Sequence, residues 1–384
     1  MKTFQCTCNH PLFFHDLRCL ACGADVAYDP TSHVLGALTA TDDGAWTIAR
    51  DIRQPAPRFR FCSQRSEAAA CNWLIPADET EIDCLSCRLT LAMPVLSRPK
   101  NITRFGVLEA AKRDLLFSLQ SWGLPVDPKT DQDPDGLAFD FLESMAGAPA
   151  VLTGHAEGLI TINVAEADSD YREKNREALK EPYRTVLGHM RHEVGHYYWN
   201  VLIRGTEWQP RFREMFGNEE ADYGEALKRH YKEGAPADWA ARCISSYASA
   251  HPWEDWAETW AHYMHIRSTL QTATSYGLDI TRARVLITPF PAAVLYKPES
   301  KESQALLEWI NAWGILTAVL NETARSMGQP DIYPFVLSPG VVTKLSFIHY
   351  VVAECAVEGQ AQRVSRRALR VRRRFERSAA RQAH

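Results

Sequence analysis

The chain lacks any long apolar run. Crossing a bilayer takes about 20 consecutive apolar residues, and no stretch of the 384-residue sequence approaches that length. The opening segment, MKTFQCTCNH, also lacks the apolar core of a secretion signal. Because 46% of the residues are hydrophobic and 23% are charged, the composition is that of a soluble globular protein. We therefore expect a cytoplasmic protein that does not enter a membrane.

The chain has no strong net charge, since its formal net charge is only -4, and its sequence has no internal repeat. The charge is uneven, however, because residues 359–384 carry nine arginines and one glutamate. A terminal arginine run is usually a solvated or frayed helix, and less often an arm that binds nucleic acid, an acidic protein or an anionic membrane. We expect an arginine-rich C-terminal tail over these residues.

Cysteine is scarce beyond residue 90, where only Cys243 and Cys355 occur, and we expect both to be buried thiols. The other cysteines precede residue 90 and come in pairs, a distribution that cytosolic chains use for metal binding rather than for disulfides. By sequence order they form two sets of four. The first set is Cys6, Cys8, Cys19 and Cys22, and the second is Cys62, Cys71, Cys84 and Cys87.

Each set can complete the tetrahedral shell of a structural zinc ion, because four thiolates leave no ligand position open. Zinc binding supplies about 10 to 16 kcal/mol per site, which lets a short segment fold without a large core. We predict a double zinc ribbon over residues 1–92, with a possible contact to protein or nucleic acid. Two alternatives stay open at this point. His10 or His15 could replace one cysteine, and ligands of the two sites could interleave.

The rest of the chain is mainly helical by its hydrophobic period. Pro94 and Pro99 mark a linker over residues 93–104, and residues 105–358 form the second domain. The segment GLITINV predicts a strand, so the fold class is α+β with a small sheet. We expect the helix that follows this strand to have Pro182 in its first turn and to end near Gly205.

The segment RHEVGHYYW, residues 191–199, predicts a catalytic zinc site. His192 and His196 are four residues apart, so they lie on one face of a helix and can bind the same ion. Glu193 would then lie beside a water molecule that zinc makes acidic. We predict that Glu193 is the general base and later passes the proton to the leaving amine.

A third ligand has to come from another part of the chain. The metzincin pattern needs glycine at 199 and histidine at 202, and the sequence has Trp199 and Leu202 instead. The later segment SSYASAHPWEDWAETWAHYMHI provides Glu254 and Glu258, one helical turn apart. Either carboxylate could complete the site, and His262 is a weaker alternative.

These motifs resemble those of the bacterial zinc-binding metallopeptidases that carry an N-terminal zinc ribbon. The resemblance covers nearly the whole chain, through CTCNHPLFF, CLACG, CNWL, RHEVGHYYW, HPWEDWAETWAHY and DIYPFVLSP. In addition, SYASAHPWEDWAE resembles the second motif of gluzincins related to the lethal-factor catalytic domain. In that motif a tyrosine precedes an E-x-x-A-E helix by seven residues. The resemblance implies a zincin-like metallopeptidase domain.

The resemblance also implies a role for each residue of the second motif. Glu254 would be the third zinc ligand, and Glu258 would accept a hydrogen bond that orients His192 or His196. Tyr247 would stabilise the developing oxyanion. The sequence departs from the wider gluzincin pattern at residues 255–256, which are Asp-Trp in place of an apolar pair.

The expected function is a zinc-dependent peptidase that acts on a protein or peptide. GLITINV would be an edge strand that pairs with an extended substrate, or else an interior strand. His155, just before it, could contact substrate or be a plain loop residue. The segment from 212 to 234 could wall the cleft or be a solvated helical insertion. Alternatives to a general peptidase are a zinc amidase or peptidase restricted to one modified protein, and a non-catalytic zinc-ribbon binding module.

Overall fold

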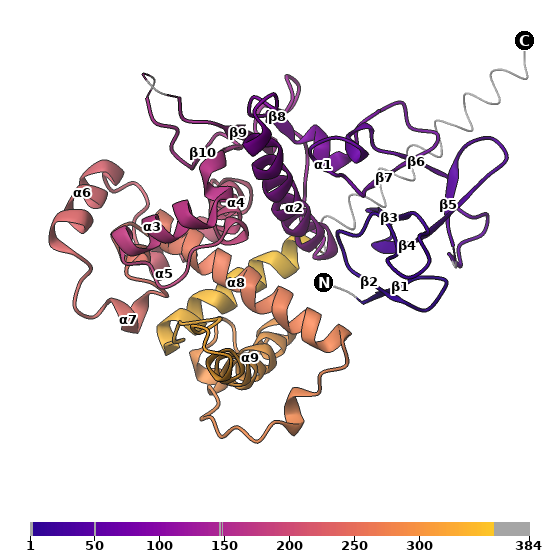
Figure 1. Cartoon of the computed structure of the whole chain (residues 1–384). Coiled ribbons are helices and arrows are strands. Elements are labelled where there is room, and N and C mark those ends of the chain that lie inside the picture. The colour runs from indigo at the N-terminus through magenta and orange to yellow at the C-terminus, as the bar shows by residue number, and fades with distance from the viewer. Residues whose placement is uncertain (1–2, 50, 146, 148, 357–384) are drawn as a thin grey trace, which may run out of the picture.

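The computed structural model describes residues 3–49, 51–145, 147 and 149–356. The arginine-rich tail predicted for 359–384 lies outside these residues. Within them, no helix combines the length and the apolar character that crossing a bilayer requires. The chain begins with short strands around cysteine-bearing turns and continues as a mainly helical domain with a small sheet (Figure 1). This confirms the predicted α+β fold class.

The N-terminal part is a zinc-ribbon-like array of short strands. β1 (Phe4–Gln5) pairs with β2 (Pro11–Leu12), and the cysteines of the first set lie on the turns around this pair. Five further strands form an antiparallel meander in chain order. They are β3 (Val26–Asp29), β4 (Val34–Ala40), β5 (Trp46–Ile48), β6 (Phe59–Phe61) and β7 (Leu74–Pro76), followed by the short helix α1 (Leu85–Arg88).

A second sheet of four strands supports the helical domain, with the order β10-β11-β9-β8. β11 is parallel to β9 and antiparallel to β10, so it is an interior strand. The expectation that GLITINV forms the edge is therefore wrong. A separate short strand, β10, takes that place and pairs with β11. The strands are β8 (Thr90–Ala92), β9 (Ala138–Leu142), β10 (Gly154–Ala156) and β11 (Leu159–Asn163).

The long helix α2 (Pro99–Ser121) lies between the ribbon and the other helices (Figure 1). Pro99 occupies its first turn, where a fixed φ and a missing N–H are tolerated. The predicted linker 93–104 is therefore too long at its C-terminal end. Phe117 of α2 packs on Phe14 of the ribbon, with ring centroids 4.9 Å apart, so one apolar core runs from the ribbon into the helical domain.

The helices α4 (Val186–Leu202) and α8 (Pro252–Ser275) pack closely against each other. Gly195 permits this approach, because a Cβ there would lie 3.0 Å from Cα of Ala257. Helix α4 begins later than predicted from Pro182. Thr185 is its N-cap and accepts a hydrogen bond from the Gly188 N–H at 2.9 Å. This cap fixes the first turn of the helix.

The remaining helices surround this pair. Residues 339–356 form a further helix that packs against the start of α8 through Lys344. The other α-helices are α3 (Ser169–Leu179), α5 (Trp208–Phe216), α6 (Tyr223–Glu233), α7 (Trp239–Arg242) and α9 (Lys301–Ser326). The 3-10 turns are η1 (Ser63–Arg65), η2 (Val164–Ala167), η3 (Tyr247–Ala250), η4 (Ile280–Arg282) and η5 (Ala292–Val294).

Candidate metal and catalytic sites

The structure gathers the cysteines into two compact clusters. In each cluster the four sulfur atoms lie within 4.8 Å of one another. Neither cluster includes His10 or His15 among its ligands, and the ligands of the two clusters do not interleave. His15 instead bonds Asp114 of α2 at 3.0 Å. The clusters are Cys6, Cys8, Cys19 and Cys22, and Cys62, Cys71, Cys84 and Cys87, as the sequence order predicted.

The sulfur geometry of the second cluster fits a divalent cation. The Sγ atoms of Cys71 and Cys84 are 3.5 Å apart, and the thiol of Cys84 is buried. Hydrogen bonds from Cys71, followed by those from Cys84 and Cys87, lower the pKa of Cys62 far below that of a free thiol. Thiolates gathered in a buried space require a compensating positive charge, which four-coordinate zinc supplies.

The third group of possible metal ligands lies between α4 and α8. One ligand atom from each of His192, His196 and Glu254 lies within 4.8 Å of the other two. The Nε2 atom of His192 is 3.1 Å from Oε2 of Glu254, and the Nε2 atom of His196 is 3.6 Å from its Oε1. The two imidazoles come from successive turns of α4, and the carboxylate comes from the first turn of α8.

Glu258 lies one turn further along α8 and contacts the other side of His192. Its Oε1 is 2.8 Å from Nδ1 of His192, and its Oε2 accepts a hydrogen bond from Ser245 Oγ at 2.6 Å. Burial raises the pKa of Glu258, but the hydrogen bond with His192 outweighs it and brings the pKa to about 2. An ionised Glu258 accepts the Nδ1–H of His192, which leaves Nε2 free to bind a metal.

The polar atoms of this group fit a bound cation. Oε2 of Glu254 is buried and has no hydrogen-bond partner among the described residues. Glu254 as a whole is only 1% exposed. A buried carboxylate facing two imidazole nitrogens is costly unless a positive charge lies between them. Nitrogen and carboxylate oxygen ligands in a set of three are typical of a zinc site with an open position.

Two further predicted residues border this group. Glu193 is 8% exposed, and burial raises the pKa of its carboxyl group. Tyr247 lies in η3, and its ring centroid is 6.1 Å from that of His192. Burial, followed by the nearby Glu254 carboxylate, raises the pKa of Tyr247, so its hydroxyl stays protonated and can donate. Tyr247 is therefore close to the ligand group, and Glu193 is close enough to His192 and His196 for their charges to act on its carboxyl group.

The structure also brings in residues that the sequence did not identify. The Tyr223 hydroxyl, from the first turn of α6, donates to Oε1 of Glu254 at 2.7 Å. The Trp253 ring packs on His196, with centroids 4.0 Å apart. No spacing motif marks Tyr223, and its only signal was the segment from 212 to 234, predicted to wall the cleft or to be a solvated helical insertion. Trp253 lies in the second motif, directly before Glu254, but no role was predicted for it.

His155 lies on the edge strand β10 rather than in a plain loop. Its ring centroid is 6.3 Å from that of His196, and its Nε2 accepts a hydrogen bond from the Gly158 N–H at 3.1 Å. Among the described residues, its Nδ1 is buried without a partner. The edge strand of the small sheet therefore runs past the candidate metal ligands, on the side of His196.

Other candidate residues have different partners. His262 bonds the Tyr333 hydroxyl through Nδ1 at 2.7 Å, so it is not part of the ligand group. His251 caps α8 through the Trp253 N–H at 3.1 Å. Arg325 pairs with Asp331 at 2.7 Å and also with Glu322. Cys243 and Cys355 are half-buried rather than fully buried.

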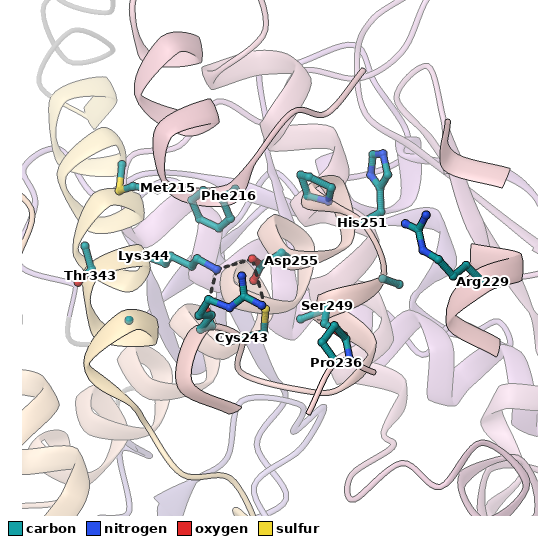
Figure 2. Close-up of a pocket in the computed structure, with 15 residues that line it drawn as sticks. Met215, Phe216, Arg229, Pro236, Cys243, Ser249, His251, Asp255, Thr343 and Lys344 are labelled. Carbon is teal, nitrogen blue, oxygen red and sulfur yellow. Dashed lines mark hydrogen bonds and ion pairs between the residues drawn. The ribbon is translucent and has the colours of Figure 1, made fainter. Parts of the chain in front are cut away.

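A cleft of about 480 Å³ is lined by residues of η3, of the first turn of α8 and of the helix 339–356. Figure 2 shows Lys344, from the helix 339–356, and Asp255 of α8 pointing toward each other in this cleft. Lys344 forms an ion pair with Asp255 and also donates to the backbone oxygen of Arg242 at 2.7 Å. Because Asp255 directly follows Glu254, this pair holds the turn that carries the possible metal ligand.

Comparisons with known proteins identify the family of each part of the chain. Residues 101–351 match the family described as "Putative zinc-binding metallo-peptidase", and residues 3–98 match a zinc-ribbon domain family. Uncharacterized proteins of Mycobacterium tuberculosis and Mycobacterium bovis are 40% identical over 359 residues, covering 93% of this chain and 96% of each relative. No solved structure matches the chain. The chain therefore belongs to this zinc-binding metallopeptidase family and carries an N-terminal zinc-ribbon domain.

Proposed function

We propose that the protein is a zinc-dependent peptidase that hydrolyses peptide bonds in a protein or peptide substrate in the cytoplasm. The observation that carries this proposal is the meeting of His192, His196 and Glu254 in one group, with Glu193 next to His192 on the same helix. Three ligands of this kind leave a fourth position open, as catalytic zinc sites do and structural sites do not.

In this proposal the chain holds three zinc ions. One is catalytic and is held by His192, His196 and Glu254, and each cysteine cluster holds one structural ion. When bound at the catalytic position, zinc supplies a Lewis acid that polarises the substrate carbonyl and makes a water molecule acidic near neutral pH. Glu258 keeps His192 in the tautomer that presents Nε2 to the ion, because it accepts the Nδ1–H.

Glu193 acts as the general base. It takes a proton from the attacking water and passes it to the leaving amine, so that one carboxylate serves both halves of the reaction. Burial raises its pKa toward the pH at which it works, which favours proton transfer in both directions. Tyr247 donates a hydrogen bond to the oxyanion that develops on the substrate carbonyl.

The substrate docks in extended form along β10. Among the described residues this strand pairs with β11 alone, so its other side offers backbone N–H and C=O groups to a peptide. Main-chain hydrogen bonds of this kind hold any sequence, and side-chain pockets then select among substrates. The zinc ribbon and the arginine-rich tail recruit or restrict the substrate through contacts with protein or nucleic acid.

The test is a Glu193→Gln variant compared with the wild-type protein. We expect both to contain three zinc ions per chain by elemental analysis, and only the wild type to cleave a panel of unfolded proteins. Hydrolysis by the variant would contradict the role of Glu193. A His192→Ala variant, expected to contain two zinc ions, serves as the control for the catalytic metal.

The same assay separates the alternative functions. A wild-type protein that is inert toward the whole panel favours a zinc amidase or peptidase restricted to one modified protein. A protein that stays bound to the Glu193→Gln variant in cells, and that the wild type cleaves, would then be that substrate. If the wild-type protein does not cleave the trapped proteins, the chain is a non-catalytic binding module.

A further inference from the structure

Helix α6 brings a phenol to the group of possible zinc ligands. This helix follows the segment after α5 and lies at the periphery of the molecule in Figure 1. Its first residue is Tyr223, whose hydroxyl donates to Oε1 of Glu254 at 2.7 Å. Glu254 is fully buried, so a donor that reaches it comes from a side chain directed into the site rather than from solvent.

The two oxygen atoms of Glu254 have different surroundings. Oε1 receives the Tyr223 hydroxyl, whereas Oε2 has no hydrogen-bond donor among the described residues and lies 3.1 Å from Nε2 of His192. A carboxylate can bind a metal through one oxygen or through both. A donor held on one oxygen favours binding through the other alone, because it occupies a lone pair and draws charge toward itself.

The position of Tyr223 is fixed from several sides. Asp222 caps α6 by accepting a hydrogen bond from the Glu225 N–H at 2.9 Å, which sets the first turn. The Tyr223 ring packs edge-on against His251 and Trp253, with centroids 5.3 and 6.0 Å away. A side chain held in this way presents its hydroxyl at one point, which is what a positioning residue requires.

Tyr247 touches the same phenol. The Tyr223 hydroxyl donates to Oε1 of Glu254 at 2.7 Å and also forms a hydrogen bond with Tyr247. The two tyrosines belong to different elements, α6 and η3, and they meet at the ligand group.

We infer that Tyr223 is a positioning residue that holds Glu254 in the single-oxygen binding mode through its hydrogen bond to Oε1. This inference rests on the proposed function, since it takes Glu254 to be a ligand of the catalytic zinc. It assigns α6, an element between the two sequence motifs, to the metal site. Without the phenol, the Glu254 carboxylate rotates or binds the ion through both oxygens. A second carboxylate oxygen then competes for the open ligand position.

The experiment measures zinc affinity at the catalytic site of the full-length protein with a Tyr223→Phe variant. Competition with a chelating dye should give a dissociation constant about 10- to 100-fold higher than that of the wild type, as for other residues that orient a ligand. Tyr231→Phe is the matched control, because Tyr231 lies on the same helix, is 63% exposed and loses the same hydroxyl. We expect its affinity to be unchanged.

A second readout separates positioning from a loss of folding. The cobalt(II) form of each protein gives a visible spectrum, and subtracting that of His192→Ala isolates the catalytic site from the cysteine clusters. The Tyr223→Phe difference spectrum should be weaker, because an added carboxylate oxygen raises the coordination number. Affinity and spectrum equal to those of the wild type would overturn the inference. If His192→Ala binds as much metal as the wild type, the proposed catalytic site itself is wrong.

Discussion

His192 donates from Nδ1 to Glu258 at 2.8 Å while its Nε2 faces Glu254 at 3.1 Å, so one imidazole lies between two carboxylates. The two carboxylates are one turn apart on α8, and the imidazole belongs to α4. The pair of helices thus determines both the position of the ring and its tautomer. Glu258 has this effect on His192 and not on His196, a choice that the sequence left open.

The first prediction is that Glu258→Ala weakens zinc binding at the catalytic site by about 10- to 100-fold. Without its acceptor, Nδ1 of His192 loses the contact that fixes the tautomer, and the ring is free to rotate. Zinc content after dialysis against a series of buffered zinc concentrations gives the affinity. Glu225→Ala is the control, because Glu225 is exposed and pairs with Lys228 outside the site. Equal affinities would show that Glu258 does not orient the ring.

The second prediction concerns Tyr247. Tyr247→Phe should lower kcat by about 10²- to 10³-fold, the usual effect of losing one donor to an oxyanion, with zinc content unchanged. The measurement is steady-state hydrolysis of a peptide that the wild type cleaves, with the metal determined on the same samples. A variant that keeps its kcat would rule Tyr247 out as the donor. The role would then fall to another group near the metal.

The cysteine clusters and the histidine pair were predictable because their geometry is local. Two imidazoles four residues apart on a helix share a face in any fold, and the grouping of the cysteines follows sequence order. Glu254 was harder, since its place depends on how α8 packs on α4 through Gly195. Glu254 and Glu258 have the same chemistry, and only the packing of α8 on α4 separates their roles.

The edge strand and Tyr223 could not be predicted, for two physical reasons. An interior strand and an edge strand differ in their pairing partners, and the hydrophobic pattern of GLITINV is compatible with both. The actual edge, β10, has only three residues and a weak strand pattern. Tyr223 lies in a polar, mostly exposed helix, where nothing in the spacing indicates that one phenol turns inward to Glu254.

The third prediction is that Cys84→Ser removes one zinc ion and destabilises the whole chain. Loss of a structural metal lies at the high end of single-residue effects, on the order of 4 kcal/mol. The effect should spread beyond the ribbon, because Phe14 packs on Phe117 of α2 within the same apolar core. Elemental analysis and denaturant unfolding test it. Cys355→Ser, which changes a cysteine outside both clusters, should keep all three ions.

The fourth prediction follows from the ion pair between Lys344 and Asp255. Both side chains are buried, and the Lys344 ammonium also donates to the backbone oxygen of Arg242. Lys344→Met leaves a buried carboxylate without its partner, which costs about 3 to 5 kcal/mol. Replacing Asp255 by Leu in the same chain removes that charge, so the double variant should recover much of the loss in free energy of unfolding.

The pH dependence of the Lys344→Met variant provides the sharper test. Burial raises the pKa of Asp255 to about 6 while Lys344 lowers it, so the pKa should rise further in the variant. The pKa in the unfolded chain is about 3.9, so the folded state binds the proton more tightly. The free energy of unfolding therefore falls as the pH rises from about 3.9 through the pKa of Asp255 in the folded state. The difference in unfolding free energy between the wild type and the variant should therefore be larger at pH 8 than at pH 5. A difference that stays constant with pH would mean that Asp255 does not carry the penalty, and the double variant should show no such trend.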